Sequence, residues 1–156
     1  MMLVPTPFGC DLFVAASDDG VTESRFVTRT RSRARAERSK PKHPLLRDVT
    51  RQLDAYFAGR LPRFDVPLVL DGTPFAIEVW RAVAQIPSGA LASYAEIAAA
   101  IGRPNAHRGV ARALASTPLA LFVPAHRVIG ADGRIKGATP GSMRRRLLAF
   151  EGIEIR

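Results

Sequence analysis

The pattern of apolar residues changes at Thr73, and this change constrains the fold more than any other feature of the sequence. Before Thr73, short apolar runs alternate with turn residues, whereas after it apolar residues recur at helical spacing between clear start and stop residues. A chain of 156 residues can hold one large domain or two small ones. We therefore predict two domains, over residues 1–68 and 69–156.

The first half predicts an α/β domain made of a small antiparallel sheet and a helix. Two apolar runs, residues 12–16 and 21–27, flank an Asp-Asp-Gly turn that ends at Gly20. An Asp-Gly pair between apolar runs is a strong hairpin signal, because glycine adopts positive φ without steric cost. Apolar residues at helical spacing then predict a helix over residues 44–58, which Gly59 ends.

The second half predicts a series of helices. Thr73 can cap a helix whose first residue is a proline, and Ser93-Tyr94-Ala95-Glu96 forms a capping box for the next helix. Gly102 ends that short helix, and Arg103-Pro104-Asn105 begins another. Two short helices joined by a tight turn are typical of a helix-turn-helix, although many helical hairpins bind no DNA.

The second of these short helices, residues 106–115, consists largely of alanine, with Gly109 and two arginines, Arg108 and Arg112. Small residues let a helix approach another surface closely, and arginines can reach past the backbone of that surface. Both properties suit a helix that lies in a DNA groove. Tight packing against another helix, with two solvated arginines, explains the same residues equally well.

The charge of the chain favours a nucleic-acid partner. There are 23 Lys and Arg against 14 Asp and Glu, a net charge of +9. Residues 101–156 hold ten of these basic residues and three acidic ones, and residues 25–42 hold eight and one. Such clustering is expected of a surface that neutralises phosphates. For residues 28–42, which lack apolar periodicity, a solvated loop is favoured over a dedicated binding arm.

Composition also excludes several classes of protein. The single cysteine, Cys10, rules out an internal disulfide and a cysteine-based zinc cluster. No window approaches 18 apolar residues, so no membrane span is predicted, and the start does not resemble a signal peptide. We expect a cytoplasmic monomer, nucleoid-associated if bacterial, with no metal and no cofactor.

One segment of the second half predicts a functional site. A short apolar run leads into Pro124-Ala125-His126-Arg127-Val128, and a histidine presented beside a turn can exchange a proton near neutral pH. The structural alternative is a loop in which His126 is buried and satisfied by hydrogen bonds.

This segment resembles the Pro-Cys-His-Arg-Val active-site segment of the O6-alkylguanine-DNA alkyltransferases, with Ala125 in place of the cysteine that accepts the alkyl group. The resemblance extends from Thr73 to Gly152, and the first half matches the family's N-terminal α/β domain more loosely. More specifically, the chain resembles the alkyltransferase-like proteins, the branch of the family that lacks this cysteine.

The resemblance implies a fold and a function. The fold is an α/β N-terminal domain followed by a mostly α-helical, winged helix-turn-helix-like DNA-binding domain. The function is non-catalytic recognition of O6-alkylguanine in double-stranded DNA by minor-groove binding and base flipping, which signals the lesion to nucleotide excision repair proteins. Extrusion exposes an edge that is otherwise stacked in the duplex, and it costs less at a badly paired base.

Residue roles follow from the same resemblance. Arg108 matches the arginine that fills the space of the extruded guanine, Tyr94 the tyrosine that helps to rotate it out, and Glu151 the glutamate that hydrogen-bonds the histidine. The resemblance assigns to the base pocket Tyr94, Ala125, His126, Arg127, Val128, Ala138, Thr139 and Glu151. It assigns to DNA binding Ser93, Tyr94, Arg108, Gly109, Ala111 and Arg112.

Some residues depart from the family pattern. The Asn-Pro before the active-site segment is Thr117-Pro118, a glycine of the groove helix is Arg112, and a pocket tyrosine is Ala138. Ala125 and Ala138 both remove volume, so we hypothesise a pocket that admits O6-alkyl groups larger than methyl. A wing is expected at residues 130–135, followed by a last helix that begins at Thr139-Pro140.

No alkyl transfer is predicted, because a methyl side chain cannot accept the group by the thiolate route. Two alternatives stay open. One is a methyltransferase inactivated by the exchange of cysteine for alanine, or one that uses another nucleophile. The other is a general DNA-binding module that has lost lesion recognition.

Overall fold

The computed structural model describes residues 1–29, 43–130, 133 and 142–153. They form two compact units. Unit 1 comprises Met1–Leu70 with Pro118–Phe122, and unit 2 comprises Asp71–Thr117 with Val123–Arg156. The expected domain boundary at residue 68 stays a prediction. No helix among the described residues is both long and apolar enough to cross a membrane.

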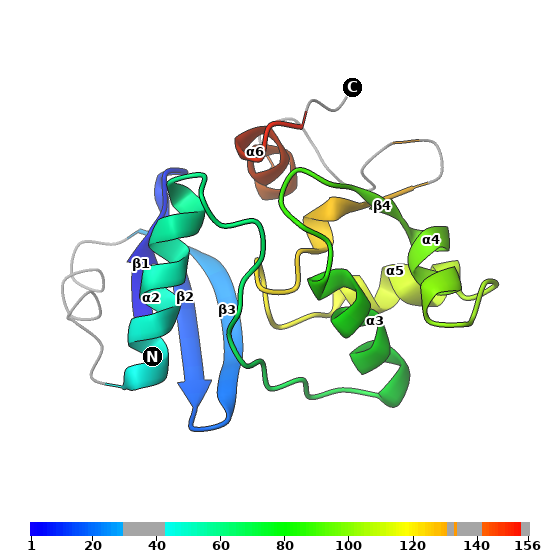
Figure 1. Cartoon of the computed structure of the whole chain (residues 1–156), viewed down its shortest axis with the longest axis horizontal. Helices are drawn as coiled ribbons and strands as arrows, with labels where there is room; N and C mark the ends of the chain where they lie inside the picture. The colour runs from blue at the N-terminus through cyan, green and yellow to red at the C-terminus, as the bar shows by residue number, and fades with distance from the viewer. Residues whose placement is uncertain (30–42, 131–132, 134–141, 154–156) are drawn as a thin grey trace. The chain divides into compact units, whose positions relative to one another are not determined.

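Unit 1 contains the predicted antiparallel sheet and helix (Figure 1). The sheet has the order β1 (Met2–Pro5), β2 (Cys10–Ser17) and β3 (Gly20–Thr28), so the hairpin prediction is confirmed. Helix α2 (Pro44–Phe57) is linked to β1 by a hydrogen bond that the Thr50 hydroxyl donates to the Met2 sulfur.

Unit 1 has an apolar core between the sheet and α2. Four consecutive residues of β2, from Asp11 to Val14, are buried, so this central strand is covered on both faces. One face of α2 is buried, with residues three or four positions apart. The fully or almost fully buried side chains of these elements are Leu12, Val14, Val21, Val49, Leu53 and Tyr56.

The outer edge of β3 is covered by segments from later in the chain. Val21 forms a parallel bridge with Leu68, and Ser24 forms one with Leu119. The approach beside Val21 is so close that a Cβ on Gly20 would lie 2.5 Å from the Pro67 carbonyl oxygen. Glycine at the turn therefore serves the packing of a third segment as well as the hairpin.

Unit 2 is mostly helical. Its elements are α3 (Pro74–Ala84), β4 (Ala92–Ser93), α4 (Tyr94–Ala100), α5 (His107–Ala115), the 3₁₀ turn η1 (Ala125–Arg127), β5 (Val128–Ile129) and α6 (Met143–Phe150).

The caps of the first helices of unit 2 agree with the sequence. The Thr73 hydroxyl oxygen accepts a hydrogen bond from the Ala76 N–H at 3.1 Å. Ser93 and Glu96 form the complete capping box at the start of α4. These two caps confirm both predicted helix starts, because local hydrogen bonds satisfy the free N–H groups of a first turn.

Two predicted helix starts are wrong by a few residues. Helix α5 begins at His107 rather than at Arg103-Pro104-Asn105, and its N-cap, Ala106, has no side chain that could accept a hydrogen bond. Helix α6 begins at Met143, where the Ser142 hydroxyl oxygen accepts from Arg145 N–H, and not at Thr139-Pro140. Most of the wing expected at residues 130–135 lies outside the described residues, and so do Ala138 and Thr139.

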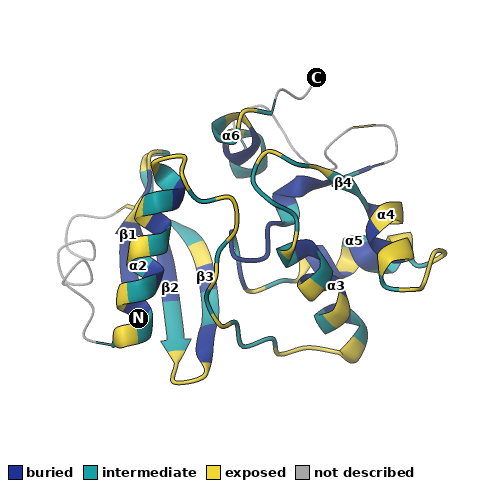
Figure 2. Cartoon of the chain, viewed as in Figure 1, coloured by how far each residue is buried: buried dark blue, intermediate teal, exposed yellow. Residues whose placement is uncertain are grey.

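Burial follows the helical period throughout unit 2 (Figure 2). Trp80 is 3% exposed and donates its indole N–H to the Ala113 carbonyl at 2.9 Å, which joins α3 to α5. Trp80 is therefore a core residue. In α6 the buried residues are Leu147 and Leu148, whereas Met143 and Phe150 are only half-buried.

Candidate functional site

Two short strands bring the start of the helix-turn-helix beside the histidine segment. β4 and β5 pair in parallel, with Ala92 opposite Val128 and Ser93 opposite Ile129. Tyr94, which is 8% exposed, follows directly as the first residue of α4. The pairing therefore joins the α4 capping box to the strand that follows η1, although Ser93 and Val128 are 35 positions apart in the sequence.

Three charged or titratable side chains meet at the end of α6. Both oxygens of Glu151 accept hydrogen bonds from Arg127, with Nε to Oε1 and Nη2 to Oε2 each 2.8 Å long. His126 Nε2 lies 2.8 Å from Glu151 Oε2. The third guanidinium nitrogen, Arg127 Nη1, donates to the Ile86 carbonyl at 2.7 Å.

This ion cluster, defined as His126, Arg127 and Glu151, is buried. The side chain of Glu151 is fully inaccessible, and those of His126 and Arg127 are each 3% exposed. A buried carboxylate is costly unless it is paired and hydrogen-bonded. The two-point contact with Arg127 meets that requirement, because a guanidinium matches the geometry of a carboxylate.

Local structure places each member of the ion cluster. His126 and Arg127 lie in η1, a single 3₁₀ turn that follows Pro124. Glu151 is the C-cap residue of α6, and the two buried leucines of that helix, Leu147 and Leu148, anchor it in unit 2. The cluster thus connects η1, α6 and the segment after α3.

The environment keeps His126 neutral near pH 7. Burial lowers the pKa of His126 from its ordinary value of 6.5, and the charges of Arg127 and Arg144 lower it further, against the opposing effect of Glu151. A neutral imidazole has one N–H, and the carboxylate of Glu151 can only accept. The hydrogen bond therefore assigns the proton to Nε2 and leaves a lone pair on Nδ1.

Ala125 stands at the first position of η1, immediately before His126, and is only partly buried. Its methyl group carries no nucleophile. The one cysteine of the chain, Cys10, belongs to β2 in unit 1, where its sulfur lies 3.4 Å from the Thr6 hydroxyl. Nothing at position 125 itself can form a covalent bond to an alkyl group.

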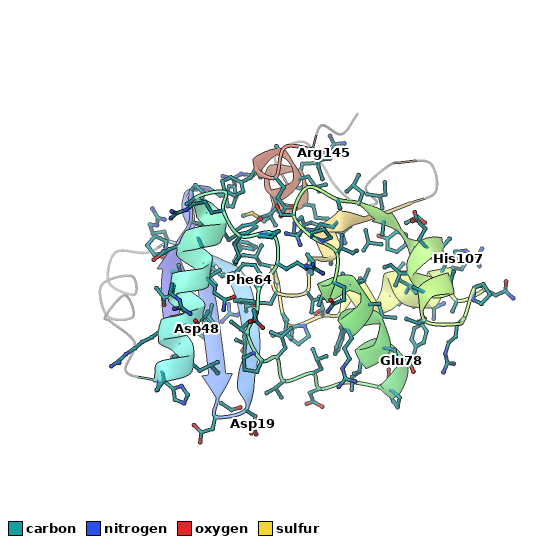
Figure 3. All side chains as sticks on the ribbon, in the orientation of Figure 1. Asp19, Asp48, Phe64, Glu78, His107 and Arg145 are labelled. Atoms are coloured by element: carbon teal, nitrogen blue, oxygen red, sulfur yellow. The ribbon has the colours of Figure 1, made fainter. Side chains whose placement is uncertain are left out.

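Helix α5 has an exposed side that carries its cationic residues. His107, Arg108 and Arg112 are exposed, and Ala111 is half-buried. Figure 3 shows His107 at the solvent-facing start of the helix. A Cβ on Gly109 would lie 3.2 Å from the ring of Phe75, so this glycine supports close helix packing, the alternative that the sequence left open for it.

A cavity of about 600 Å³ lies beside the same helix. Its walls come from α3, α5 and the segment before α3, and they include Phe75, Trp80 and Arg112. None of the residues of the ion cluster borders it. The cavity is therefore not the base pocket that the resemblance implies.

The structure brings together some of the predicted site residues and leaves others apart. His126, Arg127 and Glu151 meet directly, and Ser93 and Tyr94 adjoin Val128 through β4 and β5. Ala138 and Thr139 lie outside the described residues. Sequence reasoning missed the contact of Arg127 with Ile86, because a backbone carbonyl leaves no signal in the residue pattern.

An α/β unit, a helix-turn-helix with an exposed cationic helix, and a buried His–Glu–Arg cluster define a class of protein with a nucleic-acid-binding half. Comparison with known families makes the class specific. Residues 74–153 match the DNA-binding domain of 6-O-methylguanine DNA methyltransferase, and residues 2–70 match its ribonuclease-like domain. The chain belongs to the O6-methylguanine DNA methyltransferase family.

Individual relatives agree with this assignment. The methylated-DNA–protein-cysteine methyltransferase of Mycolicibacterium paratuberculosis is 42% identical over 149 residues, 95% of this chain and 89% of that one. The protein of the same name from Methanosarcina barkeri is 46% identical over 95 residues, and the match spans 60% of its length and 61% of this chain.

Solved structures show the same fold. The Mycobacterium tuberculosis O6-methylguanine methyltransferase is 39% identical, with a TM-score of 0.79, and the match covers 96% of this chain and 90% of that one. The M. tuberculosis protein in complex with DNA gives 38% identity and a TM-score of 0.77, over 96% and 91% of the two chains. The predicted fold class is confirmed by these matches together with the two family models.

Proposed function

We propose that this protein binds O6-alkylguanine in duplex DNA and cannot accept the alkyl group on its own chain. In this proposal it derives from a methyltransferase: Ala125 stands in place of the acceptor cysteine, and the His126–Glu151 pair is kept. The ion cluster carries the proposal, because an oriented, buried His126–Glu151 pair is present although position 125 holds no sulfur. That the relatives are named methyltransferases supports descent from an active enzyme.

The restored acceptor tests the proposal directly. In the variant Ala125→Cys, the neutral imidazole of His126 would stand beside a thiol that it can deprotonate. We expect Ala125→Cys to take up one labelled methyl group per chain from a duplex that contains O6-methylguanine, whereas the unaltered protein takes up none. Intact-protein mass spectrometry measures both.

Ala125→Ser is the matched control. It introduces a hydroxyl of a size similar to the thiol of cysteine, and an imidazole activates a hydroxyl far less readily, so we expect no uptake of the methyl group. If Ala125→Cys binds the lesion duplex and yet stays unalkylated, the site has diverged to binding alone, and descent by a single inactivating exchange is wrong. If the unaltered protein itself retains the methyl group, the non-acceptor proposal is wrong.

Lesion binding is tested separately from transfer. Gel-shift titrations of alkylated and normal duplexes at one fixed salt concentration are expected to show tighter binding of the alkylated duplex, because salt alone changes such affinities strongly. Equal affinity would instead favour a general DNA-binding module. A preference for O6-benzylguanine over O6-methylguanine would support the larger pocket inferred from Ala125 and Ala138.

The step after recognition is also part of the proposal. A protein that holds a lesion without removing it must hand it to another activity, and excision of the damaged strand is the reaction class that fits. Co-purification of nucleotide excision repair proteins only when lesion duplex is present would support this step.

A further inference from the structure

We propose that the site of Ala125 and His126 transfers the alkyl group of O6-alkylguanine to a small diffusible thiol, with His126 Nδ1 as the general base. The inference depends on the binding part of the proposed function, because it needs the lesion to be held at this site, and it takes the place of the excision step. It goes beyond that function by adding a second substrate, a low-molecular-weight thiol, and a turnover reaction.

The first step of the argument is the orientation of the imidazole. His126 Nε2 is engaged by Glu151 at 2.8 Å, while Nδ1 has no hydrogen-bond partner among the described residues. A neutral imidazole held in this tautomer presents a lone pair at Nδ1. Such a nitrogen can accept a proton from any acidic group that reaches it.

The second step is the stability of the protonated form. When Nδ1 takes a proton, the imidazolium is paired at once with the carboxylate of Glu151, whose other oxygen is held by Arg127 at 2.8 Å. Arg127 is itself tied to the Ile86 carbonyl at 2.7 Å. The partners are thus in place before the proton moves, which is the arrangement expected of a general base.

The third step is the residue beside that base. A cysteine at position 125 would carry one sulfur atom more than Ala125, and Ala125 is only partly buried. A small thiol can bring a sulfur atom to that place from solution. The site fits such a molecule by its chemistry, since the thiol supplies the one group that position 125 lacks.

The nature of the base selects a thiol over water. The pKa of His126 is lowered by burial, so the imidazole is a weak base. It can deprotonate a thiol, with a pKa of about 8.5, far more readily than water, and the thiolate is the better nucleophile towards carbon. Hydrolysis by the same site is therefore expected to be slow.

The proposed reaction balances without a redox partner. The thiol proton moves to His126 Nδ1, a new S–C bond forms to the alkyl carbon, and the bond from that carbon to O6 breaks. The electron pair of the broken bond stays on the guanine, which takes the proton back from the imidazolium. The products are a thioether and an unmodified guanine, and the protein is unchanged.

The experiment uses the full chain with a duplex that carries O6-[methyl-labelled]guanine, and hydrosulfide, methanethiol or glutathione as the thiol. We expect labelled S-methyl product in excess of one per protein with hydrosulfide and methanethiol. Glutathione should give less product, because Ala125 is partly buried between Pro124 and His126, both buried, and a bulky thiol would reach it less readily. His126→Gln should slow product formation by about 10²-fold or more, the usual contribution of a general base.

Two further variants keep the test informative if His126→Gln folds poorly. Ala125→Val fills the space without touching the base and should abolish the reaction with methanethiol. Arg51→Gln alters an exposed ion pair of α2 in unit 1 and should leave the rate unchanged.

The outcomes separate this inference from the proposed function, because lesion binding is measured in the same samples by gel shift. Bound lesion duplex without labelled thioether overturns the thiol reaction and leaves the binding function standing. Label attached to the His126 peptide also overturns it, since the imidazole would then be the acceptor. Loss of any preference for the lesion duplex overturns the proposed function.

Discussion

Arg127 and Glu151 are joined by two 2.8 Å hydrogen bonds, one to each carboxylate oxygen, in a site where neither side chain is more than 3% exposed. This pairing explains the state of the third residue. Because Arg127 already compensates the charge of Glu151, His126 can donate to the same carboxylate without becoming protonated. The pair therefore provides a neutral, oriented imidazole beside Ala125.

Loss of Arg127 should destabilise the protein strongly. Arg127→Met removes the two-point partner of the buried Glu151 carboxylate, and removing one member of a buried pair costs about 3–5 kcal/mol. The free energy of unfolding from urea titrations measures this. Arg51→Met, which breaks the exposed pair with Asp48 in α2, should cost no more than about 1 kcal/mol. Similar losses in the two variants would contradict the structural role of Arg127.

The stability of the protein should depend on pH through His126. Because burial lowers its pKa in the folded state, the unfolded chain takes up a proton below pH 6.5 that the folded chain does not. This contribution to stability is complete above pH 6.5 and is lost as the pH falls towards the folded-state pKa.

His126→Gln should remove this part of the pH dependence. Unfolding titrations of both proteins between pH 7.5 and pH 5, the range chosen to bracket the ordinary pKa of about 6.5, measure the difference. Parallel curves would show that the burial of His126 has no such effect.

The hairpin turn at Gly20 should not tolerate a side chain. Gly20→Ala places a Cβ 2.5 Å from the Pro67 carbonyl oxygen, so either the hairpin or the segment at Leu68 must move. Gly9→Ala is the matched control, because Gly9 has a positive φ of 78° and open space at its Cβ. The control should cost about 1–2 kcal/mol from backbone strain, and Gly20→Ala about 1–3 kcal/mol more. Thermal unfolding compares the two, and equal costs would argue against the close approach.

The two arginines of α5 should affect DNA binding differently. If Arg108 fills the space of an extruded guanine, Arg108→Ala weakens binding to alkylated duplex more than to normal duplex. If Arg112 contacts a phosphate, Arg112→Ala should weaken both equally and reduce the slope of log K against log salt by about 1. Anisotropy titrations at several salt concentrations measure these effects. Identical behaviour of the two variants would contradict their separate roles.

Local signals account for the parts of the fold that sequence reasoning predicted correctly. The turn between β2 and β3, the Thr73 cap and the Ser93–Glu96 capping box all involve residues a few positions apart. Where such a signal was missing, the prediction failed: α5 starts at His107, and its N-cap, Ala106, offers no hydrogen bond. The segment of Pro118–Phe122 belongs to unit 1, and nothing in its own residues indicates that.

The sequence alone determined that position 125 has no acceptor sulfur and that a histidine follows it, because these are facts of covalent chemistry. It also determined the hairpin turn and the capped helix starts, since their hydrogen bonds close within a few residues. Only the tertiary structure decided that Arg127 holds both oxygens of Glu151 and the Ile86 carbonyl, and that Gly109 faces Phe75. These contacts join residues 24 to 41 positions apart, or two different helices, so they depend on how the chain returns to itself and not on any local pattern.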